Sequence, residues 1–587
     1  MNKEIKNSKI PLDPSKKLRV ISLGGMYEIG KNTWVYECGE DIMLIDAGLA
    51  FPSVGMIGVD IVLPKLNYLV ENREKIKALV VTHGHEDHIG GIVPLFREID
   101  VPIIYGPNLA MGLLKGKFKE ARISFDNIQL TADRTTIEVG SSFSVTYIRN
   151  NHSIADSFSL IIDTPAGRVF HTGDFKIDHS PIDNLYLDVA SIARAGEDGV
   201  NLLISDSTNS EKPGYTPSEK VVIPKLKEII NNAKKRTYIT TFASQVLRIK
   251  LIIELVLKAN KKLALFGRSM INLAGISKDL GYMNFPDNFV VKQEDVHKIP
   301  PEDLVVLCTG SQGEQFAALS RISRNEHKYM KIQQGDVVVM SASPIPGNEK
   351  SVNNLINCLF KRGADVVYGL GHQIHVSGHA SQEEQKMMIN LVQPEFFMPC
   401  HGEYRMLVKH AETGVHCGVD PDKVMIADNG DVMQMQNGQC QILDRVEAGI
   451  IMVDNANVGE LDTNIMVERR MIASEGALMI GMTINAYGEL MDKPKVYAKG
   501  IVRSPNESKE QFIRKVIESA QRGLETSNHK PDQKSSKKDQ KLEPEKIKTD
   551  IRSEIHDLLD RKMNRHPLLE VILMEYTGKA AAEVLGA

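Results

Sequence analysis

The sequence predicts an α/β protein in which a mixed sheet lies between helices, with a second, parallel α/β domain inserted into the first. In the first 209 residues, short apolar runs bounded by turn residues alternate with helical segments. From about residue 210 to residue 370 the pattern changes to regular strand–helix pairs, which favour a parallel sheet with helices on its faces. Strand and helix signals after residue 465 indicate a further, small domain.

Length and composition leave several function classes open and disfavour others. A chain of 587 residues has room for several domains, since one domain takes roughly 150 residues. The net charge of −4 shows no overall basic excess for nucleic acid, although it does not exclude a local basic channel. Six scattered cysteines form neither a zinc-finger pattern nor a disulfide framework and are expected to be reduced core thiols. No stretch resembles a signal peptide or a membrane span, so we expect a cytoplasmic protein that does not bind membranes.

The first strand is expected at residues 18–23. The segment Gly25–Asn32 that follows has the glycine and lysine spacing of a P-loop. However, Asn32 replaces the hydroxyl that would bind Mg²⁺, and residues 33–38 have the pattern of a strand where a P-loop needs a helix. Nucleotide binding is therefore disfavoured, and we interpret the segment as a strand–loop–strand unit at an antiparallel edge of the sheet.

The most informative stretch is Thr82–Gly91, directly after an apolar run that predicts a buried strand. His83 and His85 point the same way on an extended segment, and Asp87 and His88 follow where the chain turns into a helix. Imidazole and carboxylate groups suit Zn²⁺ or a similar ion. Four such groups exceed what one half-open site needs, so we expect two metals. A polar loop with incidental histidines is the disfavoured alternative.

Two later residues also have the position expected of ligands. His152 and Asp174 each come just after a predicted strand, as the first cluster does. Alone, each would more often be an ordinary hydrogen-bonded polar residue, but the shared position at strand ends favours ligation. A dinuclear site requires a carboxylate between the two cations, and Asp174 is the natural candidate. Asp206 ends one more predicted strand.

These motifs resemble those of a known superfamily. The segment His83-x-His85-x-Asp87-His88, with His152 and Asp174, resembles the metallo-β-lactamase fold. Three further motifs resemble its β-CASP nucleic-acid-processing branch: Asp206 in Ser-Asp-Ser-Thr-Asn, Ser377-Gly378-His379-Ala380, and Pro399-Cys400-His401-Gly402-Glu403. Within that branch the chain is similar to the ribonuclease J family from about Leu18 to its C-terminus. The resemblance implies an αββα sandwich with an inserted β-CASP domain and a small α+β C-terminal domain.

The expected domain boundaries follow from this resemblance and from the sequence pattern. Residues 1–209 and 370–445 would form the metallo-β-lactamase domain, 210–369 the β-CASP domain, 446–465 a linker and 466–587 the C-terminal domain. Within the last, residues 525–549 contain almost no apolar residue and are predicted to be disordered. A solvated charged loop is preferred there to an arm that grips RNA. Residues 551–576 are predicted to be helical.

The resemblance implies a role for each candidate ligand. His83, His85 and His152 would hold one zinc, Asp87, His88 and His401 the second, and Asp174 would bridge them. The expected cofactors are two Zn²⁺ per subunit, with Mn²⁺ or Mg²⁺ as alternatives. Two such ions lower the pKa of a bound water and clamp the attacking and leaving oxygens of a phosphodiester.

Three residues would carry the catalytic roles beside the metals. Asp87 would also orient the attacking water. His379 would stabilise charge or protonate the leaving oxygen, and Asp206 would fix the tautomer of its ring. A buried His–Asp hydrogen bond without a catalytic role is the alternative for this pair.

The resemblance also implies a pocket for the 5′-phosphate of RNA near the metals. Its residues would be Ala243, Ser244, Gln245, His375, Val376, Ser377, Gly378 and His379. Relatives often carry asparagine where this chain has Gln245, so Ser244 is the firmer candidate. A phosphate pocket one nucleotide from the metals would measure cleavage from the 5′ end, and a triphosphate should fit less well.

The expected function is that of a metal-dependent ribonuclease with 5′→3′ exonuclease activity on 5′-monophosphate RNA and some endonuclease activity, in RNA maturation and decay. A related β-CASP DNA nuclease and a non-catalytic RNA-binding paralogue are the alternatives. Lactam or thioester hydrolysis is disfavoured, because such enzymes need no insertion of this size. The expected partners are single-stranded RNA, further copies of the chain in a dimer or tetramer, and other RNA-decay proteins.

Overall fold

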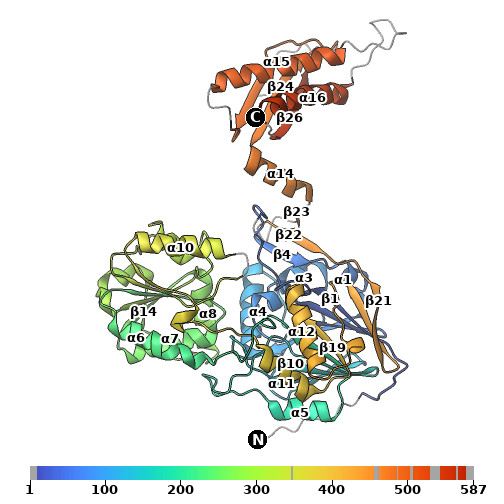
Figure 1. Cartoon of the computed structure of the whole chain (residues 1–587), viewed down its shortest axis with the longest axis vertical. Coiled ribbons are helices and arrows are strands. Elements are labelled where there is room, and N and C mark those ends of the chain that lie inside the picture. The colour runs from blue at the N-terminus through green and yellow to red at the C-terminus, as the bar shows by residue number, and fades with distance from the viewer. Residues whose placement is uncertain are drawn as a thin grey trace. The chain divides into compact units, whose positions relative to one another are not determined.

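The structure is a computed structural model that describes residues 10–53, 55–345, 348–454, 460–461, 463–485, 487–502, 507–528, 543–563 and 566–576. The chain forms two compact units, one of residues 1–52 and 60–453 and the other of residues 53–59 and 454–587 (Figure 1). Among the described residues, no helix has both the length and the apolar character that a membrane crossing requires.

Two sheets form the central layers of the first unit. The eight-stranded sheet has the order β21-β20-β1-β2-β3-β5-β6-β7, with bounds β1 Leu18–Gly24, β2 Thr33–Cys38, β3 Asp41–Ile45, β5 Ile76–Val80, β6 Ile104–Pro107, β7 Ile128–Thr131, β20 Asp431–Gln436 and β21 Gln439–Arg445. The six-stranded sheet has the order β19-β12-β11-β10-β9-β8, with bounds β8 Thr136–Val139, β9 Phe143–Arg149, β10 Phe158–Thr164, β11 Gly167–His171, β12 Leu202–Asp206 and β19 Phe396–Cys400.

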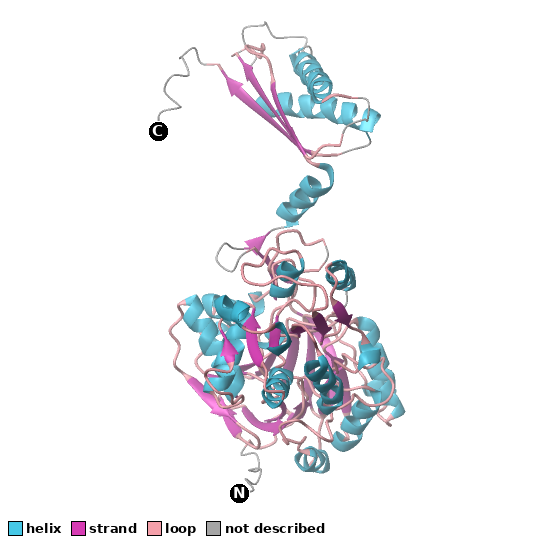
Figure 2. Cartoon of the chain, turned by 90° about the vertical axis from the view of Figure 1, so that its left-hand side faces the viewer, coloured by secondary structure: helices cyan, strands magenta, loops and turns pink. Residues whose placement is uncertain are grey.

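Alternating side chains explain how these sheets stack with helices outside them (Figure 2). On β1, Val20 packs into a core shared with the six-stranded sheet, whereas Ile21 packs into the layer under the helices, because successive strand residues face opposite ways. The helices of the first unit outside the insertion are α1 Asn67–Glu71, α2 Glu86–Ile89, α3 Ile92–Glu98, α4 Asn108–Ala121, α5 Val189–Glu197, α11 Gln382–Val392 and α12 Tyr404–His416. The predicted αββα sandwich is thereby confirmed.

Two details of this domain correct the sequence-based expectations. The strands β1 and β2 are not at an edge, because the returning strand β20 pairs with β1 on its other side. Part of the predicted linker 446–465 is a strand: the apolar residues Ile450–Val453 form β22, which pairs antiparallel with β4 (Ile61–Pro64). Residues 455–459 and 462 of that linker lie outside the described residues.

The inserted domain confirms the predicted parallel sheet. Its strands have the order β15-β14-β16-β13-β17-β18, with bounds β13 Thr237–Thr240, β14 Lys262–Phe266, β15 Val290–Val291, β16 Leu304–Cys308, β17 Val337–Met340 and β18 Asp365–Val367, and every pairing is parallel. Its helices are α6 Ile223–Asn232, α7 Val246–Lys258, α8 Arg268–Asp279, α9 Ala318–Ser323 and α10 Glu349–Lys361. On β13, Tyr238 and Ile239 enter different apolar clusters, so both faces of the sheet are covered.

The second unit is a small α+β domain, as predicted. Its three strands, in the order β25-β24-β26, are β24 Ala477–Ile484, β25 Lys495–Lys499 and β26 Leu568–Glu575. Its helices are α14 Thr463–Glu475, α15 Lys509–Asn528 and α16 Pro544–Met563. Leu478, Ile480 and Met482 of β24 pack with Val516 of α15 and Ile551 of α16 in one core.

Two predictions for this unit need correction. The helix predicted to Tyr576 ends at Met563, and β26 follows, because Leu569 and Val571 alternate with exposed neighbours and pair in parallel with β24. The segment 525–549 was predicted to be disordered, but α15 and α16 extend into both of its ends. Residues 529–542 lie outside the described residues.

Candidate metal centre

The candidate ligands gather because several strands end at one edge of the sandwich. β11, β12 and β19 are parallel neighbours, so the segments that follow them, with Asp174, Asp206 and His401, emerge side by side. In the facing sheet β3 and β5 are also parallel, which brings Asp46 next to the segment that begins at Thr82. The geometry of the fold thus explains why residues far apart in sequence meet.

The first cluster consists of His83, His85, His152 and Asp174. His85 Nδ1 lies 3.2 Å from His83 Nε2 and 2.9 Å from His152 Nε2. Asp174 Oδ2 lies 3.7 Å from both Nε2 atoms. Ligands about 2.0–2.1 Å from a tetrahedral Zn²⁺ are about 3.3 Å apart, so these four atoms have the spacing of a zinc site.

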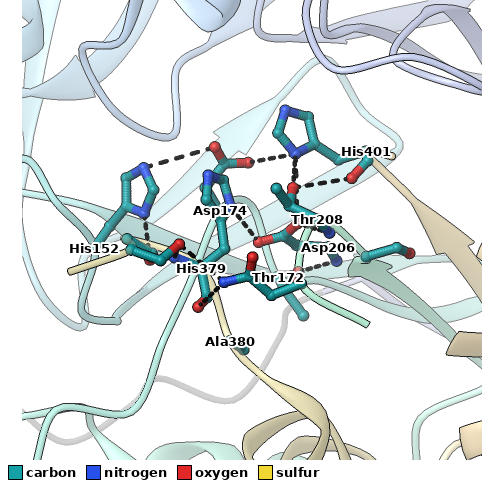
Figure 3. Close-up of polar contacts among 12 residues, drawn as sticks. His152, Thr172, Asp174, Asp206, Thr208, His379, Ala380 and His401 are labelled. Carbon is teal, nitrogen blue, oxygen red and sulfur yellow. Dashed lines mark hydrogen bonds and ion pairs between the residues drawn. The ribbon is translucent and has the colours of Figure 1, made fainter. Parts of the chain in front are cut away.

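The second cluster consists of Asp87, His88, His401 and again Asp174. His88 Nε2 lies 3.3 Å from Asp174 Oδ2 and 3.8 Å from Asp87 Oδ2, and His401 Nε2 lies 3.3 Å from Asp87 Oδ2. Figure 3 shows His152 and His401 on opposite sides of the Asp174 carboxylate. All seven predicted ligands are therefore brought together, in the grouping that the family resemblance implies, with Asp174 common to both groups.

Hydrogen bonds to the outer ring nitrogens orient two of these imidazoles. His152 Nδ1 donates to the carbonyl oxygen of Gly378 over 2.7 Å. His401 Nδ1 lies 2.8 Å from the Thr208 hydroxyl (Figure 3). In each case the other nitrogen, Nε2, is left facing the ligand cluster, as second-shell partners of metal-bound histidines do.

Asp46 is a functional candidate that the sequence reasoning missed. Its carboxylate lies 2.6 Å from His88 Nδ1 and accepts hydrogen bonds from the backbone and hydroxyl of Thr82 over 2.8 and 2.7 Å. It therefore orients His88 and holds the first residue of the ligand loop. A usable signal was present, because Asp46 follows a predicted strand just as Asp174 does.

The two clusters differ in the charge that they favour. Burial holds the pKa of His83 and His152 well below the ordinary value and lowers the pKa of His85 to about 4, so these rings are neutral donors of lone pairs. Burial also opposes the charging of His401, but Asp174 and the other carboxylates outweigh it and raise the pKa of His401 to about 10. The second cluster therefore attracts positive charge strongly, which suits a divalent cation.

His379 and Asp206 form a buried pair beside the ligands. His379 Nδ1 lies 2.7 Å from Asp206 Oδ2. Burial opposes a charge on His379, but Asp206 outweighs it, so the pKa of His379 lies above its ordinary value. The ring centroid of His379 is 4.9 Å from that of His152 and 5.5 Å from that of His401. An imidazole with a raised pKa thus lies next to the ligand clusters.

The loop from His375 to His379 adjoins the first cluster through Gly378. The carbonyl oxygen of Gly378 accepts the hydrogen bond from His152 described above. Position 378 has no room for a side chain, because a Cβ added there would lie 2.8 Å from His152 Cε1. The Ser377 hydroxyl accepts a hydrogen bond from Asn209 Nδ2 over 2.8 Å. The Val376 side chain packs in the core of the inserted domain and leaves only its backbone for other contacts.

The other predicted phosphate-binding segment is less directly placed. Gln245 is only 5% exposed, and its Oε1 accepts a hydrogen bond from the Thr241 hydroxyl over 2.6 Å. In the part of the chain that the structure describes, no hydrogen bond joins Ala243 or Ser244 to the His375–His379 loop. The two predicted phosphate-binding segments are linked instead by Arg248, which lies in the first turn of α7, just after Gln245, and contacts Nδ1 of His375.

Comparison with known proteins covers almost the whole chain. Four family models match: the metallo-beta-lactamase superfamily at residues 27–208, the ribonuclease J beta-CASP domain at 234–359, the Zn-dependent metallo-hydrolase RNA specificity domain at 365–422 and the ribonuclease J C-terminal domain at 464–576. The first and third descriptions concern the segments that carry the candidate ligands.

Curated relatives agree with these models. The chain is 48% identical to a ribonuclease J from Synechocystis over 83% of this chain and 76% of that protein. It is 38% identical to ribonuclease J of Thermus thermophilus over 96% of both chains. It is 34% identical to ribonuclease J2 of Bacillus subtilis over 96% of this chain and 99% of that one.

One solved structure has a similar fold at low identity. A crystal structure of a protein of unknown function from Enterococcus faecalis matches with a TM-score of 0.51 and 17% identity, over 71% of this chain and 99% of that one. At this identity the likeness concerns the fold alone.

Proposed function

The chain belongs to the ribonuclease J family and is a metallo-β-lactamase/β-CASP nuclease, and from this premise we propose that it is a two-zinc ribonuclease that degrades single-stranded 5′-monophosphate RNA in the 5′→3′ direction and also cuts internally. The observation that carries the proposal is the convergence of seven His and Asp ligands on two positions that share Asp174. A pair of divalent ions bound there would activate water and neutralise charge on the scissile phosphate.

The protein's own groups supply the remaining steps. Asp87 belongs to the second cluster and is the carboxylate placed to orient the attacking water. His379, whose pKa is raised by Asp206 against the effect of burial, lies next to the clusters and would donate a proton to the leaving oxygen. Asp206 holds Nδ1 of that ring, so that Nε2 is the atom free to donate.

A phosphate pocket at the His375–His379 loop would give the enzyme its direction. The loop is tied to the ligand His152, and the cations Arg248, Lys212 and Lys176 make the surroundings of His375 electropositive. The loop also offers a hydroxyl at Ser377, and the N-terminus of α7 provides backbone N–H groups nearby, linked to the loop through Arg248. A 5′-monophosphate bound there would set the distance to the scissile bond, whereas a triphosphate would fit less well.

The test uses one single-stranded RNA labelled at its 5′ end, prepared as monophosphate and as triphosphate, with and without chelator. Release of labelled mononucleotide from the monophosphate alone, abolished by chelator, would support both metals and pocket. Equal internal cleavage of both RNAs would be consistent with the two-metal site but would contradict the assignment of the phosphate pocket. Cleavage of a matched DNA but not of the RNA would assign the chain to the DNA-cleaving alternative.

A binding-only role is the remaining alternative, and His85→Ala separates it from catalysis. A protein that works by binding alone should keep its affinity for RNA and show no cleavage before or after the substitution. A nuclease should lose cleavage while an electrophoretic mobility shift still shows RNA binding.

We also propose that the second unit joins copies of the chain. The sheet face opposite α15 and α16 carries exposed apolar side chains: Met479 46%, Tyr497 64%, Ile572 48% and Met574 48% exposed. An apolar face of this kind favours self-association. Light scattering of the full chain and of a Tyr497→Lys, Ile572→Lys variant tests it, since the variant should have the smaller mass.

A further inference from the structure

Arg248 is a fully buried charged side chain near the candidate site, with 0% of its surface exposed. Its guanidinium joins three segments of the inserted domain. The Nε and Nη2 atoms donate to the two carboxylate oxygens of Glu219 over 2.8 and 2.6 Å. The Nη1 atom donates to the carbonyl and hydroxyl oxygens of Ser341 over 3.1 and 3.0 Å. A forked pair of this kind fixes both the position and the plane of the guanidinium.

The same group also reaches the segment that leads to His379. Arg248 Nη1 lies 3.2 Å from Nδ1 of His375 and 3.4 Å from the carbonyl oxygen of Ile374, and Nη2 lies 3.5 Å from that of Val376. Glu219 and the 374–376 segment belong to the two chain crossings between the domains, on either side of the insertion. Arg248 therefore holds residues 374–376, where the predicted phosphate-binding loop begins, by hydrogen bonds.

The chemistry of arginine determines which nitrogen of His375 carries the proton. A guanidinium has only donors and stays charged, so Nδ1 of His375 must accept from it. A proton on Nδ1 would point at a permanent cation. The neutral ring then has its proton on Nε2. The Ser341 carbonyl is an acceptor that favours a charged ring, but its effect is smaller than that of burial and of the three cations, and it also accepts a hydrogen bond from Arg248.

Other charges around the ring act in the same direction. Burial is the main effect, and the cations Arg248, Lys212 and Lys176 add to it, so the pKa of His375 falls to about 3. His375 is thus uncharged throughout the physiological range of pH, although it lies in the loop where an anion is expected.

We propose that Arg248 is a positioning residue that holds His375 in the Nε2–H tautomer, so that the phosphate pocket offers His375 as a neutral hydrogen-bond donor and not as a cation. This inference rests on the proposed 5′-phosphate pocket and specifies how it recognises its ligand. Arg248, whose charge is paired with Glu219, would then hold the ring from behind, while the ring supplies a directed N–H.

A matched pair of substitutions tests which ring nitrogen matters. The amide N–H of glutamine reaches the position of Nε2, whereas that of asparagine reaches only the position of Nδ1. We expect His375→Gln to keep the preference for monophosphate over triphosphate RNA within about 3-fold, and His375→Asn to lose about 10-fold or more, mainly in KM. Equal losses in both variants would overturn the proposal. Zinc content, measured in both, confirms that the metal clusters are intact.

Arg248→Met tests the positioning role. With the guanidinium removed, His375 can take either tautomer and titrate, so the preference for monophosphate should fall about 10-fold or more and vary between pH 5.5 and 8. Arg324→Met serves as control, because Arg324 forms an exposed ion pair with Glu326 in the same domain. A preference unchanged by Arg248→Met in a folded, zinc-loaded enzyme would contradict the proposal.

A spectroscopic measurement keeps the inference separate from the proposed function. Nitrogen NMR of ¹⁵N-histidine-labelled full-length protein, with the His375 signals assigned by their loss in His375→Gln, should show a protonated Nε2 and an unprotonated Nδ1 from pH 5.5 to 8. A ring that titrates with an ordinary pKa, or that is protonated on Nδ1, would overturn the inference. If the wild type shows no preference for monophosphate RNA, the proposed pocket fails, and these spectra still decide the tautomer.

Discussion

Asp46 Oδ2 lies 2.6 Å from Nδ1 of His88, and this contact joins the ends of two neighbouring strands to one metal ligand. The carboxylate is 1% exposed and makes two further hydrogen bonds to Thr82. Because it receives the proton of Nδ1, it directs Nε2 of His88 toward Asp174. The candidate metal centre would thus depend on a residue that does not itself belong to either ligand cluster.

Replacing this carboxylate should weaken the second metal position selectively. We expect Asp46→Asn to lower zinc affinity or activity by about 10–100-fold, since an amide cannot orient the imidazole as a carboxylate does. Zinc titration against a competing chelator measures the effect. Asp444→Asn is the control, because its side chain is 70% exposed. Two zinc ions bound with unchanged affinity by Asp46→Asn would refute the assigned role.

Removal of metal should reduce stability as well as activity. Three carboxylates and six histidines make up the three clusters, and without cations the like charges among them are uncompensated. A ligand at 100 times its dissociation constant stabilises the folded state by about 2.7 kcal/mol per site. Calorimetry with chelator and after addition of zinc should show a lower and then a restored melting temperature. An unchanged melting temperature in fully stripped protein would argue against structural coupling.

The pair His379–Asp206 should act as one unit in catalysis. Asp206→Asn and His379→Ala should each reduce kcat by about 10²–10⁴-fold with a smaller change in KM, since proton donation is lost in both. The double variant should be hardly worse than either single one, because the two residues share one function. Fully additive losses would show that Asp206 acts elsewhere. Zinc content must be measured alongside, since Asp206 also lies 3.4 Å from His401.

The carboxylate of Asp188 should make the stability of the folded state depend on pH. Burial alone would raise the pKa of Asp188, but hydrogen bonds from Arg134 and Ser191 outweigh it and lower the pKa below its ordinary value. The carboxylate therefore contributes stability above its unfolded pKa of about 3.9, and this contribution is lost as the pH falls through the folded pKa. Arg134→Met should lower the melting temperature by a few degrees at neutral pH. The difference in melting temperature between wild type and variant should become smaller below pH 4. Lys409→Met, which breaks an exposed pair, should show no such trend.

The two units should unfold separately. Ile555 is fully buried in a core made only of second-unit residues, so Ile555→Ala should destabilise that unit by about 2–5 kcal/mol. Trp34, the single tryptophan, lies in the core of the first unit. Its fluorescence should therefore follow an unchanged urea transition while circular dichroism shows an earlier partial one. A shift of the Trp34 transition by the same amount would reveal coupling between the units.

Local patterns in the sequence were sufficient to predict the parallel inserted sheet and six of the seven candidate ligands that the structure gathers, whereas His401 was identified only by the family resemblance. The ligands follow strands with clear apolar runs, and their residue types have few other uses at that density. Contacts made by long-range pairing were not predictable in this way. The strand Ile450–Val453 was assigned to a linker because its partner β4 lies almost 400 residues earlier, and β26 was taken for helix because its alternation is short. Arg248 had no signal at all, since its role arises only from three segments that meet in space.

The order of the ligands along the chain bears on how the enzyme is made. All members of the first cluster have been synthesised by Asp174, whereas the second cluster lacks His401 until another 227 residues have followed. At about 5–20 residues per second, this interval is roughly 10–45 s on the ribosome. During that time the nascent chain holds one complete set of candidate metal ligands and one incomplete set. Because the second position closes only when β19 has paired with β12, its loading requires that the whole insertion has been synthesised, and a chain interrupted within the insertion lacks the complete site.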